Sequence, residues 1–93
     1  MEYRLLQLDI DKSRYAFMPY AFAKDHGFDL SDYHVAYEGN APDGDPEIIL
    51  EGLFTIFNLH RPTDFKGHSM SVSDIVELDD KTYYCDSIGF VEI

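Results

Sequence analysis

The chain has 93 residues, and its 18 Asp and Glu against 7 Lys and Arg give a formal net charge of −11. A domain of half this length would bury too little surface to fold alone, so we predict one domain over residues 1–93. With 15% aromatic residues, the sequence is not a disordered acidic tail. Its single cysteine, Cys85, excludes a disulfide scaffold. Seven scattered cations cannot neutralise a run of phosphates, which argues against direct nucleic-acid binding.

The sequence has no segment of the kind that targets a chain to a membrane or through it. The N-terminal residues include Glu2 and lack the basic start and the run of about 7–15 apolar residues of a signal peptide. No stretch approaches the roughly 18 apolar residues that span a bilayer. We therefore expect a cytoplasmic protein without membrane contact, in which Cys85 stays a thiol.

A strand and a short helix are predicted in the first third of the chain. Residues 3–9 alternate imperfectly between apolar and polar and predict a strand that is buried mainly on the side of Leu6 and Leu8. A helix is predicted over 19–26, because its first residue is a proline that suits the first helical turn. Gly27 is expected to end this helix in the left-handed conformation.

The middle of the chain is predicted to hold a second strand and the main helix. Residues 33–38 alternate as a strand, and the Gly, Asn, Pro and Asp of 39–45 predict a loop. The main helix is predicted over 46–58, where Asp45 caps the start and a proline takes the first position. Apolar residues then recur at spacings of three and four. These are Ile49, Leu50, Leu53, Phe54, Ile56 and Phe57. Gly52 within this helix is expected to allow close packing on a strand.

The C-terminal third is predicted to form a hairpin and a tail. Residues 72–78 and 82–87 are typical of strands, joined by a loop of three residues over 79–81. Gly89 marks a bend before an extended tail over 90–93. The fold class is therefore α+β, with a small, mostly antiparallel sheet of about four or five strands. The main helix should pack on one face of the sheet. The hairpin and tail should form the centre of the sheet.

Four residues could support an enzyme, namely His60, His68, Asp74 and Cys85. The histidine spacing matches no zinc motif, so His60 is interpreted as a helix cap and His68 as a residue that orders its loop. Cys85 lies inside a predicted strand, where a cysteine is usually a small buried apolar residue, whereas a reactive thiol needs a cationic neighbour or a helix N-terminus. No phosphate loop or nucleophile elbow occurs. We assign no catalytic, metal or cofactor residue and leave open whether the chain is an enzyme.

The acidic residues gather in three stretches of the chain. These are Asp25, Asp29 and Asp32, then Asp43, Asp45, Glu47 and Glu51, and finally Asp74, Glu77, Asp79 and Asp80. Solvated faces and helix caps are the simplest interpretation. Alternatively, the carboxylates lie on one surface, imitate the phosphates of DNA and occupy a basic DNA-binding cleft. The net charge permits this second interpretation.

The seven tyrosines point to a protein interface or to the edge of a core. The adjacent Tyr83 and Tyr84 must face opposite sides of a strand, which predicts that one of them is exposed to solvent. Exposed tyrosine beside acidic residues is typical of protein interfaces. Tyrosines at a core edge, with their hydroxyls in water, are the equal alternative.

Several stretches of the sequence resemble the YodL-like family. The longest are residues 57–76 and 83–90, and residues 3–8 and 17–20 are also similar, so the resemblance covers nearly the whole chain. The most specific strings are Gly-His-Ser-x-Ser-Val-Ser-Asp over 67–74 and Tyr-Tyr-x-Asp-Ser-x-Gly-Phe over 83–90.

The resemblance implies a biological setting more than a chemistry. Domains of this family occur in bacteria, alone or inside large polyvalent proteins of conjugative elements and phages, beside antirestriction and DNA-processing modules. The family has no established catalytic activity, so the resemblance implies no catalytic residue and no cofactor. The motif residues form either a surface for a ligand or partner or the framework of the turns and hairpin, which we favour. They are Gly67, His68, Ser69, Ser71, Ser73, Asp74, Tyr84, Asp86, Gly89 and Phe90.

Three functions follow as hypotheses. The first is a non-catalytic accessory module of a bacterial mobile element, with a protein as its partner. The second is an acidic DNA-mimic inhibitor of the antirestriction type. The third is a small hydrolase or metal enzyme that uses His60, His68, Asp74 and Cys85.

Overall fold

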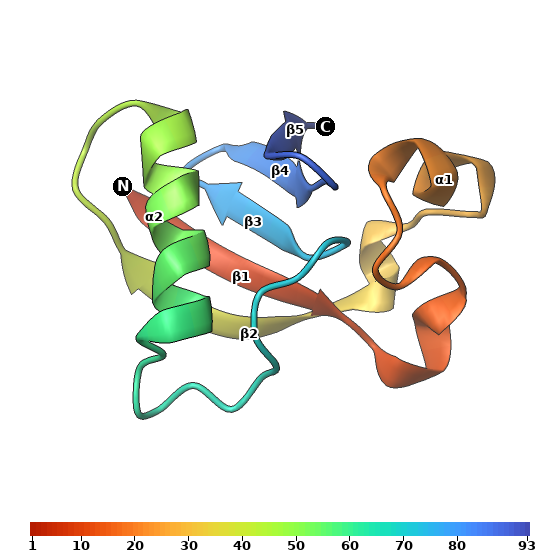
Figure 1. The fold of residues 1–93 in the computed structure, drawn as a ribbon, viewed down its shortest axis with the longest axis horizontal. Coiled ribbons are helices and arrows are strands. Elements are labelled where there is room, and N and C mark those ends of the chain that lie inside the picture. Colours follow the sequence, from red (N-terminus) through yellow and green to blue (C-terminus); the bar gives the residue numbers. More distant parts are fainter.

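The computed structural model describes residues 1–93, except for the side chains of Ile10 and Ser13. Five antiparallel strands form one sheet in the order β2-β1-β3-β4-β5 (Figure 1). The strands are β1 (Glu2–Leu8), β2 (Tyr33–Asn40), β3 (Ile75–Leu78), β4 (Lys81–Cys85) and β5 (Phe90–Glu92). With the helices described next, this sheet confirms the predicted α+β fold class.

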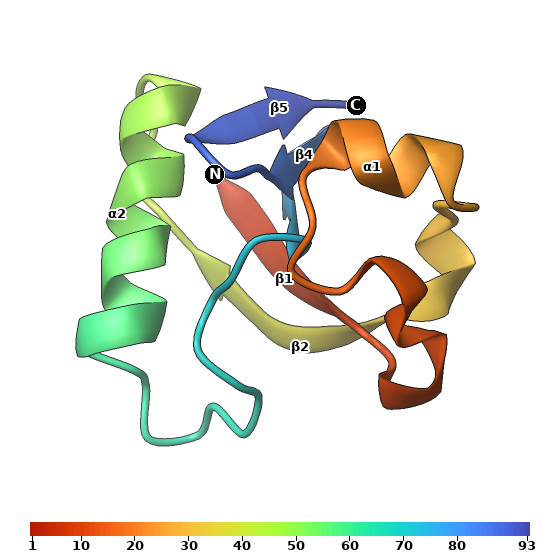
Figure 2. The same cartoon turned by 45° about the vertical axis from the view of Figure 1, so that its right-hand side comes forward.

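Helices cover both faces of the sheet. The long helix α2 (Pro46–Leu59) lies on one face, and a segment with three short helices lies on the other (Figure 2). That segment contains the 3-10 helices η1 (Ile10–Tyr15) and η2 (Leu30–Asp32) on either side of α1 (Tyr20–Asp25). Within the part of the chain that the structure describes, no helix has the length and apolar character needed to cross a bilayer.

Each face of the sheet has its own hydrophobic core. The core under α2 consists of Tyr3, Leu5, Leu50, Leu53, Phe57, Met70, Val76, Leu78 and Tyr83. The core under the α1 segment consists of Leu6, Tyr15, Ala23, Ile75 and Tyr84. Full burial of a leucine, isoleucine, valine, phenylalanine or methionine side chain contributes about 1.5–3 kcal/mol to stability. Both cores therefore contribute to the stability of the fold.

Burial on both faces corrects the prediction for the first strand. Tyr3 and Leu5 are buried under α2, whereas Leu6 is buried under the α1 segment. The expectation that this strand is buried mainly on the side of Leu6 and Leu8 is therefore wrong. The pairing of β1 with β2 shifts between Leu5 and Leu6, where β2 holds one extra residue, Ala36.

The short helix α1 forms close to where the sequence predicts it. Pro19 is its N-cap, so the helix begins one residue later than expected and ends at Asp25. Gly27 has a φ of 81° and confirms the predicted left-handed end. The N–H of Phe28 donates to the carbonyl of Ala23 at 3.0 Å, which closes the last helical turn.

The main helix α2 also follows the prediction, with a narrower buried stripe. The Asp45 carboxylate accepts the N–H of Glu47 at 2.9 Å and caps the first turn. The helix continues to Leu59, one residue beyond its predicted end. Phe54 and Ile56 belong to the predicted apolar set, yet they remain 40% and 39% exposed.

The C-terminal hairpin has a tighter turn than predicted. Leu78 pairs directly with Lys81, so only two residues form the turn, and Asp79 adopts a φ of 52°. The Asp79 carboxylate also accepts the N–H of Glu2 at 2.9 Å, which ties the turn to β1. The first hairpin strand begins at Ile75 rather than at residue 72. The tail forms the edge strand β5, so only β3 of this region lies at the centre of the sheet.

Two glycines have roles that differ from the expectation. Gly39 belongs to β2, where a β-carbon would lie 2.7 Å from the hydroxyl oxygen of Tyr3. The predicted loop over 39–45 begins two residues later, because Gly39 and Asn40 pair with Tyr3 and Glu2 of β1. Gly52 faces solvent, and a β-carbon there would meet nothing within 4 Å. The expectation that Gly52 allows close packing on a strand is wrong.

These two environments predict opposite effects of adding a methyl group. Gly52→Ala should raise the free energy of unfolding by about 1 kcal/mol, because alanine favours a helix interior without meeting a neighbour. Gly39→Ala should lower it, because the Tyr3 ring must move. Urea denaturation of both variants measures the difference, and destabilisation by Gly52→Ala would contradict the exposed position of this glycine.

Candidate functional site

Six of the ten motif residues lie in the loop that connects α2 to β3. They are Gly67, His68, Ser69, Ser71, Ser73 and Asp74. This loop passes over the end of β1 and reaches the segment that precedes α1 (Figure 2). Its hydrogen bonds converge on Gln7, a buried residue of β1 that was not among the motif residues.

A buried pair of polar side chains anchors the loop to the sheet. The Gln7 Nε2 donates to the His68 carbonyl at 2.8 Å and to Asp74 Oδ2 at 3.1 Å. Asp74 Oδ2 also accepts the N–H of Ser71 at 3.0 Å. Gly67 makes room for this arrangement, because a β-carbon at that position would overlap Gln7 Oε1. These contacts hold the loop in place as a framework.

The alternation of β1 is a sequence signal for the burial of Gln7. Gln7 follows Tyr3 and Leu5 in the alternating register of β1, and both of those side chains are buried under α2. A polar residue that continues an apolar register is a candidate for a buried hydrogen-bonded group.

Ser73 links the loop to the segment before α1 and to strands β2 and β4. Its hydroxyl accepts the N–H of Phe17 at 3.0 Å, and its carbonyl accepts the Tyr33 hydroxyl at 2.7 Å. Its own N–H donates to the Cys85 carbonyl at 2.9 Å. Both Ser73 and Phe17 have positive φ angles, 87° and 64°, which are uncommon for residues other than glycine.

A small pocket of about 240 Å³ opens where the loop meets Phe17. Its lining consists of Leu8, Asp9, Ala16, Phe17, His68, Ser73 and Asp74. Phe17 is 64% exposed, whereas Asp74 is only 1% exposed. The His68 Nδ1 lies 2.7 Å from the Ser69 carbonyl and 3.4 Å from Gln7 Nε2. The shorter contact is to an oxygen that can only accept, so we assign the proton of the neutral ring to Nδ1 and the acceptor role to Nε2. His68 Nε2 lies 3.9 Å from Asp74 Oδ1.

Burial changes the acidity of Asp74. The loss of hydration raises its pKa to about 6, although hydrogen bonds from Ser71 and Gln7 and the nearby His68 act in the opposite direction. The carboxyl group therefore titrates far closer to neutral pH than an ordinary aspartate. A perturbed acid that lines a pocket is a candidate for a functional group.

Tyr84 does not lie on the surface. It is fully buried in the core under the α1 segment, and its hydroxyl donates to the Met18 carbonyl at 2.7 Å. Tyr83 is buried in the core under α2. The two side chains face opposite sides of the sheet as predicted, but the expectation that one is exposed is wrong, because helices cover both faces.

The remaining motif residues shape the bend between β4 and β5. The Asp86 carboxylate accepts the N–H groups of Tyr20 and Ser87 at 3.2 and 2.9 Å. The Asp86 N–H donates to the Gly89 carbonyl at 2.9 Å, and Gly89 has a φ of 69°. This confirms the predicted bend and turns Phe90 toward the core under α2.

A groove lies between α2 and this bend. It consists of two hollows of about 670 and 390 Å³ that share Glu51, Gly89 and Phe90 in their walls. Ile88, 92% exposed, forms part of the wall. The carboxylates along the groove are those of Asp45, Glu47, Glu51, Asp86 and Glu92. Lys81 is the one Lys or Arg that lines either hollow.

The residues of the enzyme hypothesis lie in separate places. His60 follows the end of α2, where its N–H donates to the Ile56 carbonyl, while His68 and Asp74 line the small pocket. Cys85 lines the groove but is only 2% exposed. Burial, followed by the charges of Asp74 and Asp86, raises the pKa of its thiol to about 12. Among the side chains that the structure describes, no three His, Cys, Asp or Glu could together hold a metal ion.

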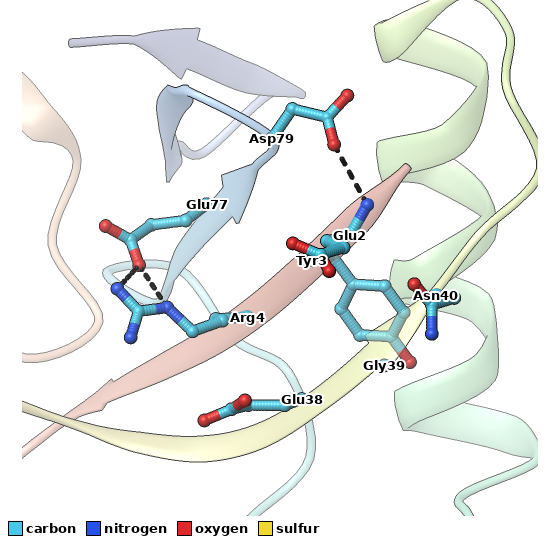
Figure 3. Close-up of a pocket in the computed structure, with 8 residues that line it drawn as sticks. All are labelled: Glu2, Tyr3, Arg4, Glu38, Gly39, Asn40, Glu77 and Asp79. Atoms are coloured by element: carbon cyan, nitrogen blue, oxygen red, sulfur yellow. Dashed lines mark hydrogen bonds and ion pairs between the residues drawn. The ribbon is translucent and has the colours of Figure 1, made fainter.

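A third hollow of about 350 Å³ lies on the sheet face beside β1 and β2 (Figure 3). Arg4 spans it and donates through Nε to Glu77 at 2.7 Å, and Asp79 accepts the N–H of Glu2. Figure 3 shows the Tyr3 ring reaching toward Gly39 at the opposite wall. Because Arg4 binds Glu77 and the Glu2 N–H binds Asp79, these polar groups already have partners within the protein. We therefore interpret this hollow as part of the sheet surface.

A family model described as YodL-like domain matches residues 2–93, so the chain belongs to the YodL-like family. Comparisons with curated proteins and with solved structures find no match.

The raised pKa of Asp74 makes stability depend on pH in a specific direction. The folded state holds this proton more tightly than the unfolded chain, so the associated stability is present below the unfolded pKa and is lost as the pH rises through about 6. Between about pH 4 and pH 7, the free energy of unfolding should therefore fall by about 2 kcal/mol more in the wild type than in Asp74→Asn.

Chemical denaturation across this pH range measures the effect. Asp43→Asn is the matched control, because it removes one carboxylate whose side chain is 93% exposed. A pH profile of Asp74→Asn that parallels the wild type would contradict the assignment.

The buried thiol gives a second prediction. Iodoacetamide should alkylate Cys85 in the native protein on the order of 100-fold more slowly than in urea, because the thiolate is rare and the sulfur is covered. Mass spectrometry of timed samples measures the two rates. Similar rates would show that the thiol is accessible and would favour the enzyme hypothesis.

Proposed function

We propose that this member of the YodL-like family is a non-catalytic protein-binding module that serves as an accessory of a bacterial mobile element. The observation that carries the proposal is the groove between α2 and the bend before β5. Ile88 lies in its wall with almost its whole side chain in water. Phe54, which is 40% exposed, lines the same groove. Several exposed apolar side chains gathered at a concave surface are typical of an interaction site.

The chemistry of the groove indicates the kind of partner segment that would fit. Leu50, Tyr83 and Phe90 provide apolar surface inside the groove, and five carboxylates lie along it. Opposite charges steer a partner to its site, so this combination favours a segment with both apolar and cationic side chains. The two hollows together are large enough for several side chains of such a segment.

The mobile-element setting is proposed from the family alone. Domains of this family accompany antirestriction and DNA-processing modules, and a protein-binding accessory could act together with such modules. The cytoplasm is the compartment in which those modules act, and we propose it as the location of this chain.

The DNA-mimic function has less support from the distribution of the acids. Asp25 and Asp29 lie around α1 and η2, on the opposite side of the sheet from the acids of α2 (Figure 2). Asp32 and Asp74 are buried, and Asp32 pairs with Arg14 at 3.0 Å. A mimic would need its carboxylates on one accessible face.

Variants of the exposed apolar residues test the proposal. A tagged chain expressed in the bacterium that carries the gene should be cross-linked to a partner protein. Ile88→Asp should reduce the recovered partner by roughly 10-fold, because it places a charge at the groove wall. Leu59→Asp is the matched control, since Leu59 is 73% exposed and does not line the groove.

Quantitative mass spectrometry measures the recovery. Equal recovery with wild type and Ile88→Asp would contradict binding through the groove, and equal loss with both variants would indicate non-specific capture.

A further inference from the structure

The small pocket beside Phe17 has features of a binding site that the groove does not explain. We propose that this pocket binds a guanidinium group carried on a short apolar stem. The proposal rests on the acceptors inside the pocket, on the aromatic ring at its mouth and on its charge. It is independent of the protein-binding function of the groove.

Two hydrogen-bond acceptors face each other inside the pocket without a donor between them. Asp74 Oδ2 is occupied by Gln7 and Ser71, whereas no described residue donates a hydrogen bond to Oδ1. His68 Nε2 lies 3.9 Å from Oδ1 and is also an acceptor in the neutral ring with its proton on Nδ1. Among the described side chains, no fully buried oxygen or nitrogen lacks a hydrogen-bond partner, so Oδ1 keeps access to the solvent in the pocket. A group with several N–H donors can reach both acceptors from there.

The ring of Phe17 stands at the mouth of this acceptor pair. It lies edge-to-face with the His68 ring, with centroids 6.3 Å apart. Its backbone has a φ of 64° and is held by the Ser73 hydroxyl, so the protein maintains an unfavourable conformation that leaves this large apolar side chain in water. Such outliers gather at ligand sites. A planar cation can stack on an aromatic face while it donates to a carboxylate.

The size and charge of the pocket narrow the class of ligand. Leu8 and Ala16 provide apolar walls, and Asp9 adds a second carboxylate, whose Oδ1 lies 2.7 Å from His34 Nδ1. In a chain with a net charge of −11, such a site favours cations over anions. A volume of about 240 Å³ is below that of ordinary drug-sized sites and fits a group the size of one side chain.

Two sources could supply this chemistry, namely a free small guanidine and an arginine side chain of a partner protein. Butylguanidinium represents the first, and a blocked Gly-Arg-Gly peptide represents the second. N-Butylurea is the matched neutral control, because it has nearly the same shape and lacks the charge.

Titration followed by two-dimensional NMR of the labelled chain tests the proposal. Butylguanidinium should shift the amide signals of Phe17, His68 and Ser73, with a Kd on the order of 1 mM for so few atoms. N-Butylurea should leave these signals in place. Shifts with the peptide as well as with butylguanidinium would show that an arginine side chain can enter the pocket, and shifts with butylguanidinium alone would indicate a free small molecule.

Variants decide whether the named residues are responsible. Asp74→Asn should weaken binding by at least about 10-fold, as for loss of a charge-assisted hydrogen bond. Asp43→Asn removes an equal charge at an exposed site and should have no effect. Phe17→Ala, at an exposed position, should weaken binding several-fold and serves as an independent test if Asp74→Asn does not fold.

Some outcomes would overturn the proposal. These are the absence of shifts at the three amides with butylguanidinium, the same shifts with N-butylurea, and unchanged binding by both Asp74→Asn and Phe17→Ala.

Discussion

The buried hydrogen bond between Gln7 and Asp74 is the interaction on which the surroundings of the 67–74 loop depend. It joins the end of β1 to a loop that comes more than sixty residues later in the chain. Burial of the carboxylate carries a cost in hydration, which Gln7 and the Ser71 N–H offset in part. The position of this loop in turn places Ser73, and through it Phe17. The shape of the small pocket therefore depends on this contact, together with the hydrogen bonds of Ser73 to Tyr33 and Cys85.

Coverage of both sheet faces explains why the two candidate sites are separate. Both candidate sites lie where a covering layer meets the ends of the strands, whereas the hollow beside β1 and β2 lies on the sheet surface. The groove forms where α2 meets the bend before β5. The small pocket forms where the 67–74 loop meets the segment before α1. The motif residues recognised in the sequence mark these two junctions, together with the buried Tyr84.

Local chemistry in the sequence was enough to predict most elements of the fold. Asp45 and the proline after it define the start of α2, and Gly27 defines the end of α1, because a cap and a left-handed glycine act within one turn of chain. What the sequence did not reveal is how far each strand is covered. Tyr83 is buried because α2 lies over it, and that contact joins distant parts of the chain. For the same reason, the register of β1 predicted one buried side where the structure has two, and Gln7 was overlooked.

The order of the strands has a consequence for how copies of the chain behave at high concentration. Only β2 and β5 have an unpaired edge, and such edges invite pairing between molecules. β5 spans just three residues and ends in Glu92, while Glu38 is exposed on β2. Like charges on these strands oppose contact between the edges of two molecules. The carboxylates of Glu38 and Glu92 therefore act against edge-to-edge association at the two strands whose backbone has an unpaired side.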